Sequence, residues 1–114
     1  MKVLVTGSRG WTDARAIRKR FAALPDDTIV ITGQADGADS LARAAALQRQ
    51  LWVVDVPVLR PHWRRHGRSA GFKRNRVMLD LSPDVVLAFW DGKSPGTKGC
   101  IEEAIRLGVP VEVA

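Results

Sequence analysis

Residues 85–97 read VVLAFWDGKSPGT, and this stretch decides the fold. The first six residues are a continuous apolar run, which is typical of a strand that is buried on both faces. The next seven form a glycine-rich turn, and an amphipathic helical pattern follows as far as Leu107. A buried strand that passes through a glycine-rich turn into a helix is the repeating unit of a parallel α/β sheet.

The same unit recurs along the chain. The patterns predict strands at 3–5, 28–32, 52–56 and 85–90 and a closing strand at 109–113, and helices at 13–24, 38–50, 69–81 and 97–107. Residues 60–67 are predicted to be a loop. Strands that alternate with helices favour a Rossmann-like, doubly wound α/β fold. We therefore predict one domain, residues 1–114, with a five-stranded parallel sheet of order 3-2-1-4-5 and helices on both faces.

Three strand-to-helix turns are rich in glycine: residues 7–10, 33–37 and 91–97. In an open α/β sheet these turns all lie at the carboxyl ends of the strands, where ligands bind. Glycine lets the backbone approach a phosphate closely, and the free N–H groups of a helix start point at it. The sequence therefore predicts a nucleotide or another nucleotide-derived phosphate ligand at this edge, with the third turn around the phosphate.

Charged and polar side chains near these turns are candidates for ligand contacts. Arg9 and Arg74 would neutralise phosphate, and Asp36 or Asp39 would either cap the second helix or hold ribose hydroxyls. Trp11 would either stack on a base or pack on the core. The residues expected to contact the ligand are Gly7, Ser8, Arg9, Trp11, Gly33, Asp36, Gly37, Asp39, Arg74, Asn75, Gly92, Lys93, Ser94, Gly96 and Thr97.

Catalysis is left open by the sequence: the protein would be a sensor, a sequestering protein or a hydrolase of an N-glycosidic or phosphoester bond. Asp39 and Glu102 are the candidate acid/base residues, and Asp39 lies closer to the strand ends. His62 and His66 have helical spacing, but the arginines around them oppose a divalent cation, so no metal is expected. No cofactor is expected, because the first turn lacks the last glycine of the dinucleotide fingerprint.

The formal net charge of +6 is concentrated in one segment, residues 60–76, which holds seven Lys/Arg and no acid. Such a segment either attracts polyanions, single-stranded nucleic acid among them, or meets an acidic protein, or is a solvated basic face. The single Cys100 excludes an internal disulfide and fits a reducing cytoplasm. The apolar runs are too short to span a membrane, so a cytoplasmic protein without a membrane partner is expected.

Four groups of residues together resemble the YspA-like branch of the SLOG superfamily, whose relatives include the Lonely Guy phosphoribohydrolases and DprA. The groups are Gly7-Ser8-Arg9; Gly33, Ala35 and Gly37-Ala38-Asp39; Trp63, Gly67-Arg68, Ala70-Gly71 and Arg74-Asn75; and Gly92, Ser94 and Gly96-Thr97. Many members of this branch belong to bacteria and their phages.

The resemblance implies a Rossmann-like fold that binds nucleotides or nucleotide-derived ligands at the strand ends. The relatives imply a homodimer that pairs through the helix containing Ala70 and Gly71. DprA implies the alternative of a single-stranded DNA-binding module that uses residues 60–76. The sequence departs from the Lonely Guy pattern because Lys98 to Ile101 separate Thr97 from Glu102, one helical turn farther than in those enzymes.

Overall fold

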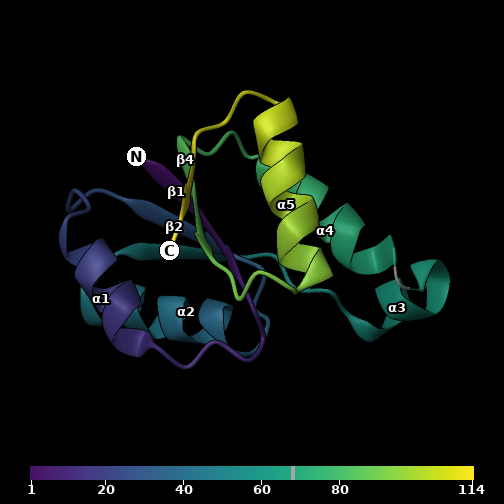
Figure 1. The fold of residues 1–114 in the computed structure, drawn as a ribbon, viewed down its shortest axis with the longest axis horizontal. Helices are drawn as coiled ribbons and strands as arrows, with labels where there is room; N and C mark the ends of the chain where they lie inside the picture. The colour runs from purple at the N-terminus through teal and green to yellow at the C-terminus, as the bar shows by residue number, and fades with distance from the viewer. Residues whose placement is uncertain (68) are drawn as a thin grey trace.

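The computed structural model describes residues 1–67 and 69–114, and its centre is a five-stranded parallel sheet (Figure 1). The strands are β1 (Lys2–Gly7), β2 (Ile29–Thr32), β3 (Trp52–Asp55), β4 (Val85–Phe89) and β5 (Val111–Val113). They lie in the order β3-β2-β1-β4-β5, and every neighbouring pair is parallel. The predicted fold class and strand order are therefore confirmed.

Helices cover both faces of the sheet. They are α1 (Ala14–Ala22), α2 (Ala38–Gln48), α3 (Arg60–His66), α4 (Ser69–Leu79) and α5 (Pro95–Arg106). Figure 1 shows α1 and α2 on one side and α4 and α5 on the other, while α3 extends beyond α4. Within the described residues, no helix is both long enough and apolar enough to cross a membrane.

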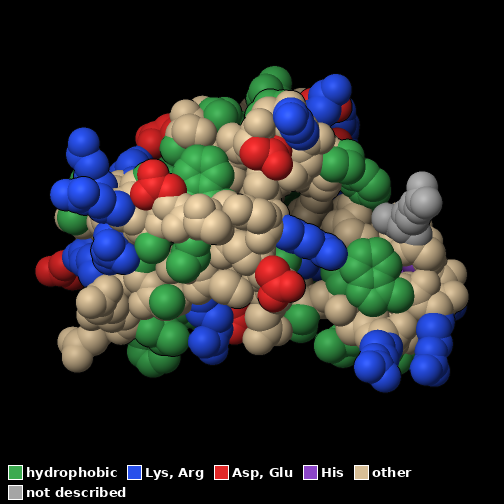
Figure 2. All heavy atoms as spheres, turned by 60° about the horizontal axis from the view of Figure 1, so that its bottom comes forward, with side chains coloured by type: hydrophobic (Ala, Val, Ile, Leu, Met, Phe, Trp, Pro, Cys, Tyr) green, Lys and Arg blue, Asp and Glu red, His purple; other side chains and the backbone are tan. Residues whose placement is uncertain are grey.

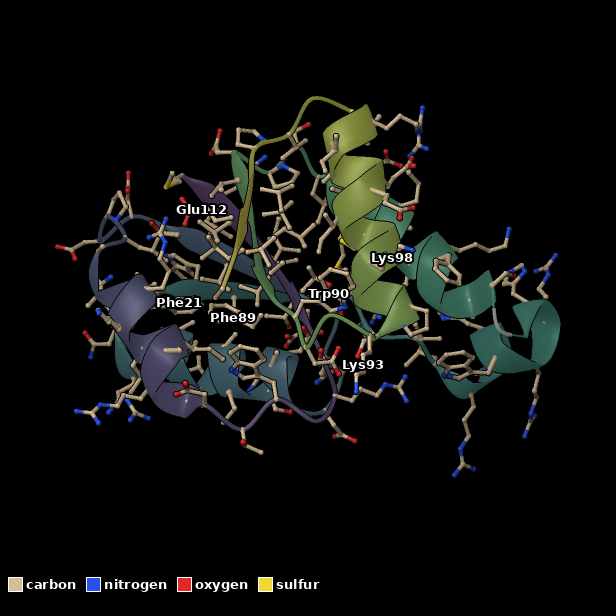
Figure 3. The ribbon with its side chains drawn as sticks, in the orientation of Figure 1. Phe21, Phe89, Trp90, Lys93, Lys98 and Glu112 are labelled. Carbon is tan, nitrogen blue, oxygen red and sulfur yellow. The ribbon has the colours of Figure 1, made fainter. Side chains whose placement is uncertain are left out.

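Alternation along the central strand divides the core into two layers. Val3 and Val5 of β1 belong to the core cluster between the sheet and helices α1 and α2. The same cluster includes Phe21 of α1 and Phe89 of β4 (Figure 3). Leu4, between them, packs with Met78 of α4 and with the buried face of α5. Successive side chains of a strand point to opposite faces, so burial on both sides explains the unbroken apolar runs in the sequence.

The predicted loop at residues 60–67 is wrong, because residues 60–66 form helix α3. Pro61 lies in the first turn, where its missing N–H costs no hydrogen bond. The ring nitrogen Nδ1 of His62 accepts the N–H of Leu59 at 3.1 Å and so satisfies a donor at the helix start. None of the residues of α3 is buried, so the segment lacks the apolar period by which helices are recognised in sequence.

Basic side chains gather at the two ends of the molecule, over α1 and over α3 (Figure 2). The α3 group consists of Arg60, Arg64 and Arg65, all exposed. In the part of the chain that the structure describes, none of these three forms an ion pair. Arg68, which belongs to the predicted basic segment, lies outside the described residues.

Two loops at the carboxyl edge of the sheet touch backbone to backbone. Gly37 has φ +73°, and a Cβ there would lie 2.2 Å from the carbonyl oxygen of Arg9. The N–H of Ala38 donates to the carbonyl of Ser8 at 3.1 Å. Gly37 is therefore required both for its conformation and for the space that its missing side chain leaves.

We expect Gly37→Ala to lower the free energy of unfolding by more than Gly108→Ala, in urea denaturation. Gly108 also has a positive φ, +77°, but a Cβ there meets open space. The control therefore carries the backbone strain, about 1–2 kcal/mol, without the clash. Equal losses of unfolding free energy in the two variants would contradict this prediction, because they would show that the close approach of the two loops adds nothing to the backbone strain.

Candidate functional site

A cavity of about 540 Å³ opens at the carboxyl ends of the strands, between the loops that follow β1 and β2 and the helices α3, α4 and α5. This is the edge at which ligands bind in open α/β sheets. Its lining residues are Thr6, Gly7, Arg9, Ala35, Asp39, Trp63, Gly71, Phe72, Arg74, Asn75, Met78, Ser94, Pro95, Gly96 and Thr97.

Asp39 and Arg74 form the polar centre of the cavity by holding the loop after β2. Oδ2 of Asp39 accepts the N–H groups of Gly33 at 3.1 Å and Ala35 at 3.3 Å. Nη1 of Arg74 donates to the carbonyl of Gly33 at 2.7 Å. A Cβ on Gly33 would lie 2.3 Å from that same Nη1, so glycine is needed at this position for Arg74 to reach the backbone.

The second carboxylate oxygen of Asp39 is left without a partner. Oδ1 is buried and has no hydrogen bond from any described residue, and the side chain is only 5% exposed. Burial raises the pKa of Asp39 to about 6, against the opposing effect of the two loop amides and the Arg74 guanidinium. A carboxyl group with a pKa of about 6 and one oxygen without a donor is able to accept a hydrogen bond or a proton from a ligand.

Asn75 joins α4 to the start of α5. Its Oδ1 accepts Nε of Arg74 at 3.1 Å, and its Nδ2 donates to the carbonyl of Gly96 at 3.2 Å. The orientation of Arg74 is thereby fixed from both ends of its guanidinium. Arg9 is exposed at the cavity and has no ion pair within the described residues.

The turn after β4 differs from the expected phosphate loop, because a carboxylate of the chain itself occupies part of it. Oδ1 of Asp91 accepts the N–H groups of Lys93 and Ser94, both at 2.8 Å, and its Oδ2 accepts the Ser94 hydroxyl at 3.1 Å. The two amide hydrogen bonds lower the pKa of Asp91 to about 2. These donors are therefore already satisfied, and Lys93 and Gly92 lie outside the cavity lining.

The amides that remain open to a ligand are those of Gly96 and Thr97, in the first turn of α5. Within the described chain neither N–H has an acceptor, and the N-cap residue Ser94 makes no side-chain cap. Both residues line the cavity. The positive φ of this turn lies at Gly92, +81°, and a Cβ on Gly96 meets open space.

The structure gathers eight of the expected site residues around the cavity: Gly7, Arg9, Asp39, Arg74, Asn75, Ser94, Gly96 and Thr97. Gly33 and Gly37 are not part of the lining, but they set the geometry of the neighbouring loop. The other expected residues outside the lining are Ser8, Trp11, Asp36, Gly92, Lys93 and Glu102.

Three of these outer residues have contacts that explain their placement. Oγ of Ser8 accepts the N–H of Asp91 at 2.9 Å and so joins the ends of β1 and β4. Trp11 packs on Phe89 with ring centroids 5.7 Å apart. Of the two roles expected for Trp11, this contact corresponds to packing on the core. Glu102 is exposed on α5 with its carboxylate 3.8 Å from Lys98, so the structure does not bring it to the cavity.

Sequence reasoning missed the apolar side of the cavity, which consists mainly of Trp63, Phe72 and Met78. Trp63 lies on α3, so the predicted loop concealed its direction. Phe72 falls within the predicted helix at residues 69–81, but the sequence does not show which face of that helix is buried. Phe72 is 50% exposed in the structure, and this exposure becomes visible only when α4 is packed on the sheet.

Comparison with known proteins identifies the family. The model of the YspA, cpYpsA-related SLOG family matches residues 1–66, more than half of the chain. The chain belongs to this family. The Gene 61 protein of Mycobacterium phage D29 is 37% identical over an aligned length of 116 residues. The alignment covers 96% of this chain and 93% of the phage protein. The resemblance inferred from the four residue groups is therefore confirmed.

A solved structure shares the fold. DNA processing protein A (DprA) from Streptococcus pneumoniae superposes with a TM-score of 0.82 at 24% sequence identity. The match covers 98% of this chain but 49% of the DprA chain, so this chain spans about half the length of that protein. At this level of identity the likeness shows the Rossmann-like fold.

We expect Asp39→Asn to become more stable relative to the unchanged protein as pH rises from 4 to 7. The pKa of Asp39 is about 6 in the folded chain against a reference value of 3.8. A carboxyl group whose pKa is raised by folding makes the fold less stable as it ionises, here by about 3 kcal/mol. The asparagine does not ionise, so the difference in unfolding free energy should grow by about 2 kcal/mol between pH 4 and pH 7, the part of the titration that this range covers.

Urea denaturation at pH 4, 5, 6 and 7 measures this difference. Asp36→Asn is the matched control, because Asp36 is exposed in the same loop and lies outside the cavity. A stability difference for Asp39→Asn that stays constant over this pH range would contradict the raised pKa. Any constant cost of burying the new amide cancels in this comparison.

Proposed function

We propose that this protein binds a nucleotide or a nucleotide-derived phosphate ligand in the cavity at the strand ends. The observation that carries the proposal is the buried Oδ1 of Asp39, which lacks a hydrogen-bond donor inside a cavity that also holds two arginines. Buried polar atoms without partners are rare in native proteins, and each requires an explanation; because Asp39 lines a cavity, a ligand group would supply one. The family and the fold agree with a nucleotide- or DNA-related role.

The cations and open amides of the cavity suit a phosphate. Arg9 and Arg74 supply positive charge, and a guanidinium binds phosphate through a fork of two N–H groups. The N–H groups of Gly96 and Thr97 at the start of α5 add donors that no described residue uses. Because Asp91 already satisfies the amides of Lys93 and Ser94, the phosphate would lie closer to α5 than the sequence suggested.

Asp39 suits the sugar. Its free oxygen is an acceptor, and ribose hydroxyls are donors that would satisfy it without adding charge. A phosphate would be repelled by the carboxylate at neutral pH, so phosphate and sugar are expected at different ends of the polar centre. The proposed ligand therefore carries at least one phosphate and one hydroxyl-bearing sugar.

We expect Gly96→Val to reduce nucleotide binding below detection while the fold is kept. A Cβ at Gly96 clashes with nothing in the chain, so the valine would occupy cavity space instead of displacing protein atoms. Isothermal titration calorimetry with AMP, GMP, CMP and UMP measures the affinity, and far-UV circular dichroism monitors the fold.

Gly10→Val is the matched control, since a Cβ there also meets open space and Gly10 does not line the cavity. Gly10→Val should bind like the unchanged protein. Unaltered affinity in Gly96→Val, or no binding of any nucleotide by the unchanged protein, would refute the proposed function.

A second candidate function, binding of single-stranded DNA, is favoured by one observation. The exposed Arg60, Arg64 and Arg65 of α3 have no acidic partner in the described chain and adjoin the cavity through Trp63. Phosphate contacts made by such residues make affinity depend steeply on salt. The fold that this chain shares with DprA is consistent with this candidate.

If α3 binds a DNA strand, the double variant Arg64→Ala/Arg65→Ala should flatten the plot of log affinity against log salt. Each lost phosphate contact lowers the slope by about 0.7, so two lower it by about 1.4. Fluorescence anisotropy with a labelled oligonucleotide measures it. The control Arg15→Ala/Arg18→Ala removes two exposed arginines of α1 and should leave the slope unchanged. Identical slopes in the two double variants would exclude α3 as the contact.

The symmetric homodimer expected from the sequence stays a prediction. Ala70 is 3% exposed, and the nearest atom to a Cβ on Gly71 is Cη2 of Trp63, at 4.0 Å. Ala70 therefore packs within one chain, whereas Gly71 is partly exposed and lines the cavity.

A further inference from the structure

Two aromatic rings form the outer, apolar side of the cavity. Trp63 of α3 is 40% exposed and Phe72 of α4 is 50% exposed, and both line the cavity. Figure 2 shows hydrophobic side chains beside a hollow at the end of the molecule that α3 and α4 form. Large exposed aromatic rings that border a pocket are candidates for contact with a ligand.

A glycine beneath the Phe72 ring holds its position. A Cβ on Gly99 of α5 would lie 2.7 Å from Cε1 of Phe72, so the ring rests directly on the helix backbone. The Trp63 ring faces Gly71, where a Cβ would be 4.0 Å from its Cη2. Phe72 is therefore seated against α5 while half of its surface stays exposed, which differs from an aromatic side chain that extends freely into solvent.

The surroundings of the rings decide what they contact. Residues 60–76 contain no acid, and the polar groups of the cavity, Asp39 and Arg74, lie on the same lining as the two rings. A ligand that fills this space has a charged, hydroxyl-bearing part and a flat apolar part. A volume of about 540 Å³ falls within the range of small-molecule sites.

We propose that Trp63 and Phe72 bind the aromatic base of the ligand, so that the cavity selects nucleotides over sugar phosphates. This inference rests on the proposed function. It adds that the base of the nucleotide contributes to affinity, in addition to the phosphate and the sugar. Every nucleobase has a π face, so stacking on these rings tolerates different bases. Free nucleotides and nucleotide units of a single strand share this chemistry.

The test compares AMP with ribose 5-phosphate, which lacks the base. Stacking is worth about 1–3 kcal/mol per base, so Phe72→Leu and Trp63→Leu should each weaken AMP binding roughly 5- to 150-fold. Ribose 5-phosphate should bind both variants as it binds the unchanged protein. Trp52→Leu is the matched control, because Trp52 is 77% exposed on β3 and lies outside the cavity.

Equal weakening of AMP and ribose 5-phosphate in the ring variants would overturn the proposal, as would unchanged AMP affinity. If neither compound binds the unchanged protein, the proposed function itself fails, and that result is distinct from a loss confined to AMP. Gly99→Ala provides an independent variant, because its Cβ would displace the Phe72 ring while every residue that lines the cavity keeps its identity. It should weaken AMP binding and leave ribose 5-phosphate binding unchanged.

Tryptophan fluorescence decides the case in which ribose 5-phosphate binds too weakly to measure. AMP should quench emission in the unchanged protein and in Trp52→Leu, and the quenching should be lost in Trp63→Leu. Quenching that persists in Trp63→Leu would overturn the proposal. Repeating the titrations with a ten-residue adenine deoxyoligonucleotide separates the two sources, since tighter binding of the oligonucleotide with the same variant losses identifies a strand as the ligand.

Discussion

The Gly33 backbone is held from two sides, and the geometry of the cavity depends on this. Asp39 accepts its N–H, while Arg74 donates to its carbonyl at 2.7 Å. Asp39 belongs to α2 on one face of the sheet and Arg74 to α4 on the other, so this loop connects the two helical layers at the strand ends. Arg74 also reaches Asn75, which contacts the start of α5, and the inner lining is thereby tied together.

The two carboxylates that contact loops at this edge have pKa shifts in opposite directions, because one is buried and the other is exposed. Asp91 is exposed and accepts two amides and a hydroxyl, and the hydrogen bonds stabilise its charge. Asp39 also accepts two amides, but burial outweighs them and its other oxygen has no donor. Asp91 thus completes its own turn, whereas one oxygen of Asp39 has no donor among the described residues, and the proposed ligand would supply one.

The sequence predicted the sheet because apolar runs, glycine turns and helical periods are all local signals. It also expected Asp39, Arg74 and Asn75 at the strand ends, where they line the cavity, since the switch point of such a sheet follows from strand order alone. It expected the phosphate along residues 92–97, because a glycine-rich turn does not reveal that Asp91 accepts the amides of Lys93 and Ser94. It missed the aromatic side, because the direction of Trp63 depends on a helix without buried residues, which no hydrophobic period marks.

Helix α3 has seven residues, and isolated helices shorter than roughly 12 residues are marginal in water, so contacts outside the helix must hold it in place. Its contacts with the start of α4 include the Ser69 hydroxyl, which donates to the carbonyl of His66 at 2.7 Å, and the Trp63 ring, which faces Gly71. Trp63 is therefore both part of the cavity wall and one of the side chains through which the basic helix meets α4. A ligand that stacks on Trp63 would also stabilise α3, and with it the position of Arg64 and Arg65. The proposed base contact and the positive field around the cavity would thus be physically coupled through one side chain, Trp63, which lines the cavity and belongs to the basic helix.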